Sequence, residues 1–290
     1  MIHRKNIIGV LFLMLKMRLR PEEIAALNLR ELYEEHNYLF FRMSRFEEYD
    51  FYAGKKDFLT SKSILTFTDI NGKLMALRPD VTLSIIKHAK NSDGIQKFYY
   101  DEKVYRVHKN SNSFREISQT GIECIGNLTD ENINEVVELA ILSLRTLAEG
   151  RKYILDISHA GMIAELLNES ENRNEILKLL SEKNIHGLKN INAPEKIIEL
   201  AKIQGNNDIE NLKCFEPIIK TLRKYKNEIN IDFSNINNLN YYNGIIFRGY
   251  IEGIPESILS GGEYDNLMRL MGNKNSKAIG FAVYLDEVRK

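Results

Sequence analysis

Gln119 and Glu123 place an amide and a carboxylate four residues apart in a segment predicted to form a β-strand. Side chains at this spacing on a strand point to the same face. An amide donates and accepts hydrogen bonds, a carboxylate accepts them, and the phenol of Tyr242 can do both. Together these groups can satisfy an ammonium group and a ring N–H. The sequence therefore indicates a pocket for a small ligand that carries both groups.

The same side chains also have a purely structural interpretation. Glu123 could pair with an arginine of the core, and Tyr241 and Tyr242 could be packing residues. Asp80 precedes a predicted helix that begins near Val81, where an aspartate commonly caps the first turn. Residue types and spacing alone favour this structural interpretation over a ligand pocket.

Several predicted strands and one long helix would position these residues. Two extended segments, 97–106 and 117–125, flank a polar loop. Residues 64–77 are predicted to form a hairpin, in which Asn71 and Gly72 suit a type I′ turn. A helix with one apolar stripe is expected at 130–148, shorter helices at 21–33 and 81–89, and further strands at 153–157, 229–233, 242–252 and 278–284.

A charged and helical stretch at about 161–227 has predicted strands on both of its sides. Strands that resume after such a stretch indicate one α+β domain with a helical insertion, and not two domains in series. We therefore expect a single domain over residues 1–290, with this stretch as its insertion.

The composition narrows the classes of function. The chain has 290 residues, of which 43% are apolar, and this is enough for a substantial core. Basic and acidic residues number 40 each, so the formal net charge is zero. Proteins that bind nucleic acids usually carry a basic excess. We therefore expect no tRNA binding.

The cysteines and the N-terminal segment bear on the compartment. Cys124 and Cys214 lack a C-x-x-C spacing, which fits a reducing cytoplasm and indicates no metal site. The apolar run at 7–15 is too short to span a bilayer and has no small-residue cleavage site after it. We expect a cytoplasmic protein without a membrane segment, and we expect no cofactor.

Four segments, in the same order, resemble landmarks of the histidyl-tRNA synthetase family. The resemblance covers roughly residues 20–290. It implies a class II aminoacyl-tRNA synthetase-like core, with a mostly antiparallel sheet flanked by helices and without the family's anticodon-binding domain. The matching segments are Leu77–Thr82, the strand–loop–strand region 98–123, Tyr241–Phe247, and Gly261–Asp265 followed by Ala278–Ala282.

Three positions depart from the catalytic pattern of that family. The arginine that stands four residues before the paired tyrosines is Asn237 here, and the arginine that ends motif three is Glu287. Glu263 replaces the arginine of the family's G-G-R-Y-D segment. Adenylate formation builds up negative charge on a phosphate, and fixed cations must stabilise that charge. The resemblance therefore implies a synthetase-like protein that does not form adenylates.

The resemblance also implies a retained histidine pocket. Glu123 and Tyr242 match the positions that meet the imidazole ring. The other matching positions are Asp80, Thr82 and Gln119 at the amino group, Arg106 of motif two, and Tyr241 beside Tyr242.

Synthetase-like cores with this combination of features resemble the regulatory subunit of ATP phosphoribosyltransferase. In that family the subunit pairs with a short-form catalytic subunit, which joins ATP to phosphoribosyl pyrophosphate in the first step of histidine biosynthesis. The resemblance implies that the chain is no enzyme itself, forms a homodimer or a larger hetero-oligomer, and takes histidine as its effector. Two alternatives stay open, an adenylating paralogue that acts on an amino acid and an interaction module without a ligand.

Overall fold

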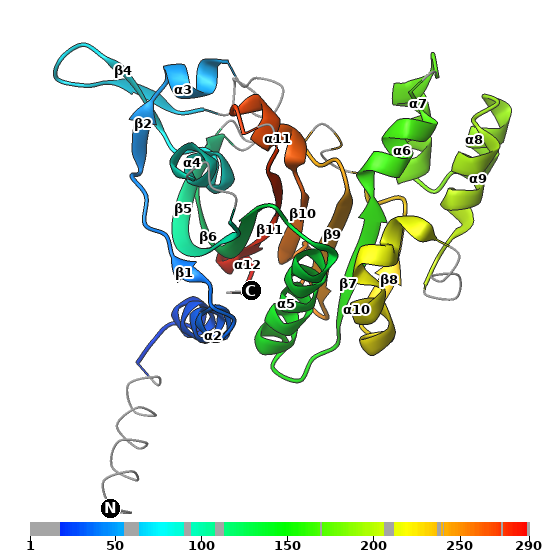
Figure 1. Ribbon diagram of the computed structural model, residues 1–290, viewed down its shortest axis with the longest axis horizontal. Coiled ribbons are helices and arrows are strands. Elements are labelled where there is room, and N and C mark those ends of the chain that lie inside the picture. The colour runs from blue at the N-terminus through cyan, green and yellow to red at the C-terminus, as the bar shows by residue number, and fades with distance from the viewer. Residues whose placement is uncertain are drawn as a thin grey trace, which may run out of the picture.

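One mixed sheet of eight strands runs through the molecule, and helices cover it (Figure 1). This computed structural model describes residues 18–54, 64–89, 94–107, 113–168, 170–205, 212–236, 239, 241–273 and 275–288. The predictions made for Asn237, for the apolar run 7–15 and for most of the polar loop after residue 107 lie outside these described residues.

The large sheet is mostly antiparallel, and only its two outermost pairs, β1 with β5 and β7 with β8, are parallel. Its spatial order is β1-β5-β6-β11-β10-β9-β7-β8. The strands are β1 Leu39–Phe40, β5 Gln96–Val107, β6 Phe114–Gly126, β7 Tyr153–His159, β8 Ile229–Ile231, β9 Ile245–Ile251, β10 Leu259–Glu263 and β11 Lys277–Tyr284.

Helices lie at both ends of the sheet order and across its faces (Figure 1). Among the described residues, none of them is long and apolar enough to cross a membrane. They are α2 Pro21–Glu35, α3 Asp50–Ala53, α4 Val81–His88, α5 Asp130–Ala148, α6 Ala160–Leu166, α7 Arg173–Ser181, α8 Ile185–Asn190, α9 Glu195–Lys202, the 3-10 helix η3 Lys213–Ile218, α10 Ile219–Lys224, α11 Asp265–Leu270 and α12 Leu285–Val288.

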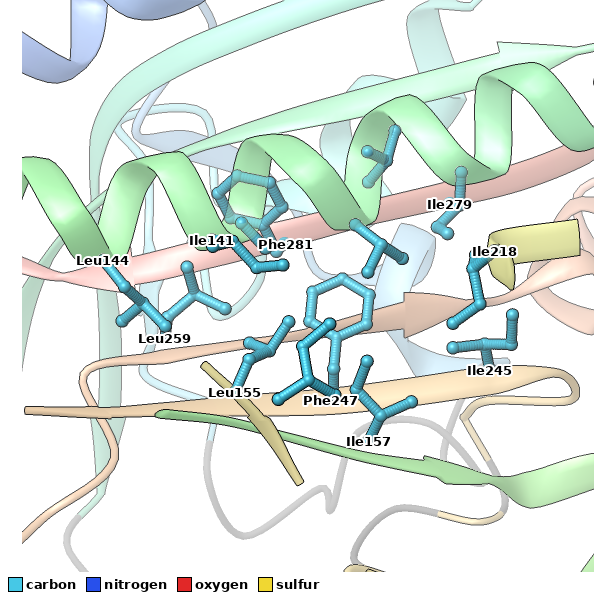
Figure 2. Close-up of a cluster of buried hydrophobic side chains, with 14 of the residues drawn as sticks. Ile141, Leu144, Leu155, Ile157, Ile218, Ile245, Phe247, Leu259, Ile279 and Phe281 are labelled. Carbon is cyan, nitrogen blue, oxygen red and sulfur yellow. The ribbon is translucent and has the colours of Figure 1, made fainter. Parts of the chain in front are cut away.

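The long helix α5 packs against one face of the sheet (Figure 2). Ile141 and Leu144 of the helix meet Phe247 and Phe281 of the strands in one buried cluster. The approach is close, because a Cβ atom on Gly249 would lie 2.6 Å from a methyl carbon of Leu144. A glycine in β9 therefore lets the helix lie directly on the strand, and this face of the sheet is the main core of the protein.

The opposite face of the sheet carries α4 and α11. Leu83 of α4 and Leu267 of α11 share a second buried cluster with Tyr100 of β5 and Ala278 of β11. The neighbouring Tyr99 belongs to the main core instead, as expected for side chains that alternate along a strand. Because α4 crosses this second face, its N-terminus lies near the middle strands of the sheet.

This architecture confirms the predicted class II synthetase-like fold, and α5 matches the predicted helix 130–148. Helices α6 to α10 occupy the stretch between β7 and β8. The assignment of residues 1–290 to one domain with an insertion stays a prediction. Three strands were not expected, namely β1, β10 and the short β2 Phe46–Glu48. Strand β9 begins at Ile245, later than the predicted residue 242.

The hairpin between residues 64 and 77 forms, but its predicted turn type is wrong. Strand β4 Leu74–Leu77 pairs with β3 Thr66–Thr68 on one side and with β2 Phe46–Glu48 on the other, in a small second sheet. A type I′ turn needs positive φ at both central residues, whereas only Gly72 has it, at 81°. The carboxylate of Asp69 accepts hydrogen bonds from the N–H groups of Asn71 and Lys73, each at 2.8 Å. These hydrogen bonds of Asp69 stabilise a loop over residues 69–73, which is longer than a two-residue type I′ turn.

Candidate functional site

Glu123 lies on the second face of the sheet, opposite Gly280 of the neighbouring strand β11. A Cβ atom at position 280 would lie 1.9 Å from Oε2 of Glu123, so only glycine leaves room for this carboxyl group. The side chain is 2% exposed. The register of β6 and β11 therefore builds a fitted place for one buried acid.

Two hydroxyl groups converge on this acid. Thr82 Oγ1, in the first turn of α4, donates a hydrogen bond of 2.6 Å to Oε1 of Glu123. The hydroxyl of Tyr264, directly after β10, donates to Oε2. We call these three residues the Glu123 cluster. It joins three elements that are far apart in the sequence.

Burial raises the pKa of Glu123 to about 8, against an ordinary value of 4.5. The hydroxyls of Thr82 and Tyr264 oppose this shift because they stabilise the carboxylate, while the nearby carboxylate of Asp80 adds to it. The acid therefore titrates near neutral pH. Such a group can accept a ligand N–H when ionised and can donate a hydrogen bond when protonated.

Asp80 and Arg106 hold the start of α4 beside the cluster. Oδ1 of Asp80 accepts a hydrogen bond from the N–H of Leu83 at 2.9 Å and so caps the helix. Oδ2 lies 3.4 Å from the guanidinium of Arg106, which also donates to the carbonyl of Pro79 at 2.8 Å. The structural interpretation of Asp80 as a cap is thus realised. Only Oδ1 of Asp80 serves the cap. The other carboxylate oxygen, Oδ2, and the guanidinium of Arg106 form a polar rim beside the Glu123 cluster.

The paired tyrosines border the cluster on another side. The rings of Tyr241 and Tyr242 meet edge to face at a centroid distance of 4.9 Å, and Tyr241 lies 6.0 Å from the ring of Tyr264. Burial raises the pKa of both phenols, so they stay protonated. A Cβ atom on Gly262 would lie 2.9 Å from the ring of Tyr242, so this ring lies directly against Gly262 of β10.

Gln119 lies on the same face of β6 as Glu123, as the sequence predicted, and is 4% exposed. Four residues along a strand span roughly 13 Å, so the two side chains start far apart. In the register of the sheet, Gln119 lies opposite Tyr284 of β11. The structure therefore brings Thr82, Glu123 and the tyrosines together and places Gln119 further along the sheet.

Two residues of the site were not assigned from the sequence. Tyr264 follows the Gly261–Glu263 strand segment directly, and that position was the only available signal for its contact with Glu123. Glu263, which replaces the arginine of the family's G-G-R-Y-D segment, is the second of these residues. Its carboxylate accepts the N–H of Ile245 at 2.6 Å, and burial raises its pKa to about 7. The same carboxylate lies against Gly244, where a Cβ atom would be 2.0 Å away. The hydrogen bond from Ile245 to Glu263 thus stabilises the start of β9, which follows the paired tyrosines.

The end of motif three also carries a carboxylate with a structural contact. Asp286 in α12 accepts a hydrogen bond from the N–H of Ser118 in β6 at 3.0 Å. Glu287 follows it in the same short helix. At this end of the site the described side chains offer acceptors where the resemblance would have required a cation.

Comparisons with known proteins identify the family of this chain. A family model described as Histidyl-tRNA synthetase matches residues 13–288. The ATP phosphoribosyltransferase regulatory subunit of Caldanaerobacter subterraneus is 33% identical, over 78% of this chain and 67% of the relative. That of Clostridium kluyveri is 29% identical, over 97% and 79%. A Histidine--tRNA ligase of Methanococcus maripaludis is 27% identical, over 90% and 69%.

Solved structures show the same fold. An ATP phosphoribosyltransferase regulatory subunit/histidyl-tRNA synthetase from Bacillus halodurans has a TM-score of 0.79 at 22% identity, covering 93% of this chain and 78% of its own. The ATP phosphoribosyl transferase (HisG:HisZ) complex from Thermotoga maritima contains a chain with a TM-score of 0.73 at 20% identity, covering 91% and 97%. The chain therefore belongs to the histidyl-tRNA synthetase family and, within it, groups with the ATP phosphoribosyltransferase regulatory subunits.

Proposed function

We propose that this chain is the non-catalytic regulatory subunit of an ATP phosphoribosyltransferase. In this role it activates a short-form catalytic subunit and senses histidine in the first step of histidine biosynthesis. One observation carries the proposal. The buried acid Glu123, held by two hydroxyls, stands at a position that the resemblance assigns to histidine, while Glu263 and Glu287 stand where the resemblance places arginines of a synthetase.

Neither carboxylate can replace a cation, and that of Glu263 is held in the fold by the N–H of Ile245. A phosphate that gains negative charge beside them would be repelled and not stabilised. Removing a single oxyanion-stabilising contact typically lowers kcat by about 10²–10³. We therefore expect the purified chain to show no exchange of pyrophosphate into ATP in the presence of histidine.

The polar groups around the cluster suit histidine. Asp80, Thr82 and Gln119 are assigned to the ammonium group, and Glu123 and Tyr242 to the imidazole ring. A carboxylate offers about four lone-pair sites, and the hydroxyls of the cluster use two of those on Glu123. The acid can still accept an imidazole N–H. Arg106 and Tyr241 are assigned to the rim of the pocket, where Arg106 already contacts Asp80.

The proposed partner is a short-form catalytic subunit, and we expect at least a homodimer of this chain within the complex. The Thermotoga maritima structure is a complex of this kind. Both cysteines are free thiols, Cys124 buried and Cys214 half-buried, which supports a cytoplasmic location. Light scattering of the isolated chain at micromolar concentration should give the mass of a dimer or larger, and a monomer would contradict this part of the proposal.

An adenylating enzyme is the second candidate, because some relatives are named Histidine--tRNA ligase. Two assays on the same preparation separate the candidates. A regulatory subunit should bind histidine in calorimetry, stimulate a short-form catalytic subunit and give no pyrophosphate exchange. Exchange above background would favour the enzyme. Stimulation without any histidine binding would favour an interaction module without a ligand.

A further inference from the structure

The buried carboxyl group of Glu123 has hydrogen-bond donors but no positive charge beside it. Its two partners, Thr82 and Tyr264, are neutral hydroxyl groups. The other carboxylate of the site does have a cation, because the guanidinium of Arg106 lies 3.4 Å from Asp80. Among the residues that the structure describes, no lysine, arginine or histidine forms an ion pair with Glu123. The site therefore contains one acid more than it contains cations.

The other titratable groups around Glu123 do not supply this charge. They are Tyr100 of β5, Tyr241, Tyr242, Tyr264 after β10 and, behind the sheet, Tyr38 and Cys124. Burial raises the pKa of each of these groups, so they stay neutral near pH 7. Strand β11 places only Gly280 opposite the acid, and α4 adds the carboxylate of Asp80. An ionised Glu123 is thus a buried charge without a counter-charge, which is costly.

An imidazole ring is a ligand group that supplies the missing cation. Between its pKa of about 6.5 and the pKa of Glu123, which is about 8, the free ring is neutral and the free acid holds a proton. When the two meet, the proton can pass from the carboxyl oxygen to a ring nitrogen, whose N–H then donates to the carboxylate. No proton enters or leaves the solvent. A charge-assisted hydrogen bond replaces a neutral one, and such bonds are roughly twice as strong.

The aromatic side chains of the site also suit a cation. The rings of Tyr241 and Tyr264 have centroids 6.0 Å apart and border the Glu123 cluster. The face of an aromatic ring carries negative charge density and attracts a cation. An imidazolium ion beside Glu123 would therefore meet a carboxylate and aromatic rings, and no cation that repels it at the acid.

We propose that Glu123 determines ligand specificity by giving its proton to the ring, so that the pocket holds histidine as an imidazolium ion. This inference rests on the proposed histidine sensor and specifies how the sensor recognises the ring. A ring without a basic nitrogen, such as that of phenylalanine, cannot take the proton and leaves the acid without a cation. Triazolylalanine has nearly the shape of histidine but a much less basic ring, so it separates basicity from shape.

The first test counts the protons exchanged when histidine binds the wild-type chain. Calorimetry at about pH 7.2, in two buffers with different ionisation enthalpies, gives this number, because this pH lies between the pKa values of the free ring and of Glu123. A proton passed from the acid to the ring predicts almost no exchange with the buffer. A neutral ring that meets an ionised Glu123 predicts the release of about one proton. Nitrogen NMR of ring-labelled histidine should show both ring nitrogens protonated in the complex.

The second test compares histidine with triazolylalanine. The wild-type chain should bind triazolylalanine roughly tenfold more weakly than histidine, because only histidine forms the charge-assisted bond. In Glu123→Gln the amide has no proton to give, so this preference should fall to about twofold or less. The matched control is Glu131→Gln, at an exposed acid in the first turn of α5, which should keep the wild-type preference.

The outcomes separate this inference from the proposed sensor. Histidine that binds with release of about one proton, or with a neutral ring, overturns the inference and leaves the sensor intact. Equal affinity of the wild type for both ligands, or an unchanged preference in Glu123→Gln, overturns it as well. If histidine does not bind the wild-type chain at all, the sensor and the inference fail together. The wild-type measurements decide the question even if Glu123→Gln does not fold.

Discussion

The two faces of the large sheet are made by alternate residues of the same strands, yet they differ in kind. On β11, Ile279 and Phe281 face α5 in the main core, whereas Gly280 and Ala282 face the candidate site. On β6, Ile122 belongs to the main core while Glu123 is the buried acid. The α5 face is filled by large apolar side chains (Figure 2). The other face has small residues in the strands and polar groups above them.

This difference assigns separate tasks to the two faces. Close packing of large apolar side chains supplies stability, since each buried side chain removes apolar surface from water. Glycines on the other face provide no such burial, and they are needed because Glu123 and Tyr242 lie across them. We therefore expect substitutions on the α5 face to change stability and substitutions on the site face to change ligand binding more than stability.

The largest effect should come from the α5 face. Phe247→Ala empties a fully buried ring position and should lower the free energy of unfolding by about 3–5 kcal/mol. Phe46→Ala is the matched control, because Phe46 is 53% exposed and should change stability by about 0.5 kcal/mol or less. Urea unfolding followed by circular dichroism measures both. Equal losses in the two variants would mean that the α5 face is not the main core.

The variant Gly280→Ala tests the site face at the position where the side chain of Glu123 has the least room. The added methyl would lie 1.9 Å from Glu123 Oε2 and 2.4 Å from the carbonyl oxygen of Ile122, so the acid must move. Overpacking of this kind costs about 1–3 kcal/mol. Gly54→Ala is the control, since nothing lies within 4 Å of its Cβ position. A Gly280→Ala variant with wild-type melting temperature and wild-type histidine affinity would show that Glu123 does not depend on this glycine.

The pH dependence of stability should reveal the buried acids. The folded chain holds the Glu123 proton up to a pKa of about 8, and Glu263 behaves alike with a pKa of about 7, whereas the unfolded values are near 4.5. The folded state thus binds more protons in this window, and stability falls as pH rises through it. Each group contributes a limiting slope of about 1.4 kcal/mol per pH unit.

The variant Glu123→Gln isolates the larger of these contributions. Between pH 4.5 and about 8, the unfolded and folded pKa values of Glu123, the free energy of unfolding of the variant should depend less on pH than that of the wild type. The variant therefore gains stability relative to the wild type as pH rises. Chemical unfolding at a series of pH values measures this. Parallel curves for the two proteins would mean that Glu123 titrates normally in the folded state.

Part of this comparison could be predicted from the sequence. Helical spacing gave the bounds of α5, and strand alternation correctly put Gln119 and Glu123 on one face. Strand β10 was missed because Leu259–Glu263 contains two glycines and a serine, which disfavour strands. It is a strand because β9 and β11 pair with it on both sides. Such pairing is a long-range effect that local propensity does not contain.

Contacts within the site were harder to predict for the same reason. Tyr264 and Glu123 are 141 residues apart in the chain, and no spacing rule joins them. The cap formed by Asp80 is local and was foreseen as the structural interpretation of that residue. The turn at Gly72 shows a third case, in which a nearby side chain, Asp69, overrides a dipeptide preference. Sequence patterns thus described the elements better than the convergence of distant elements on one acid.

The most direct test of the regulatory assignment is histidine feedback in a reconstituted complex of this chain with a short-form catalytic subunit. Wild type and Glu123→Gln are compared above the pKa of Glu123, where the wild-type carboxylate is ionised. A hydrogen bond to a charged group is worth about 1.5–3 kcal/mol, so histidine affinity and feedback inhibition should weaken together, roughly ten- to a hundredfold. Activation of the catalytic subunit without histidine should not change. Wild-type feedback in Glu123→Gln, with only its melting temperature altered, would show that Glu123 supports the fold and that histidine is sensed elsewhere.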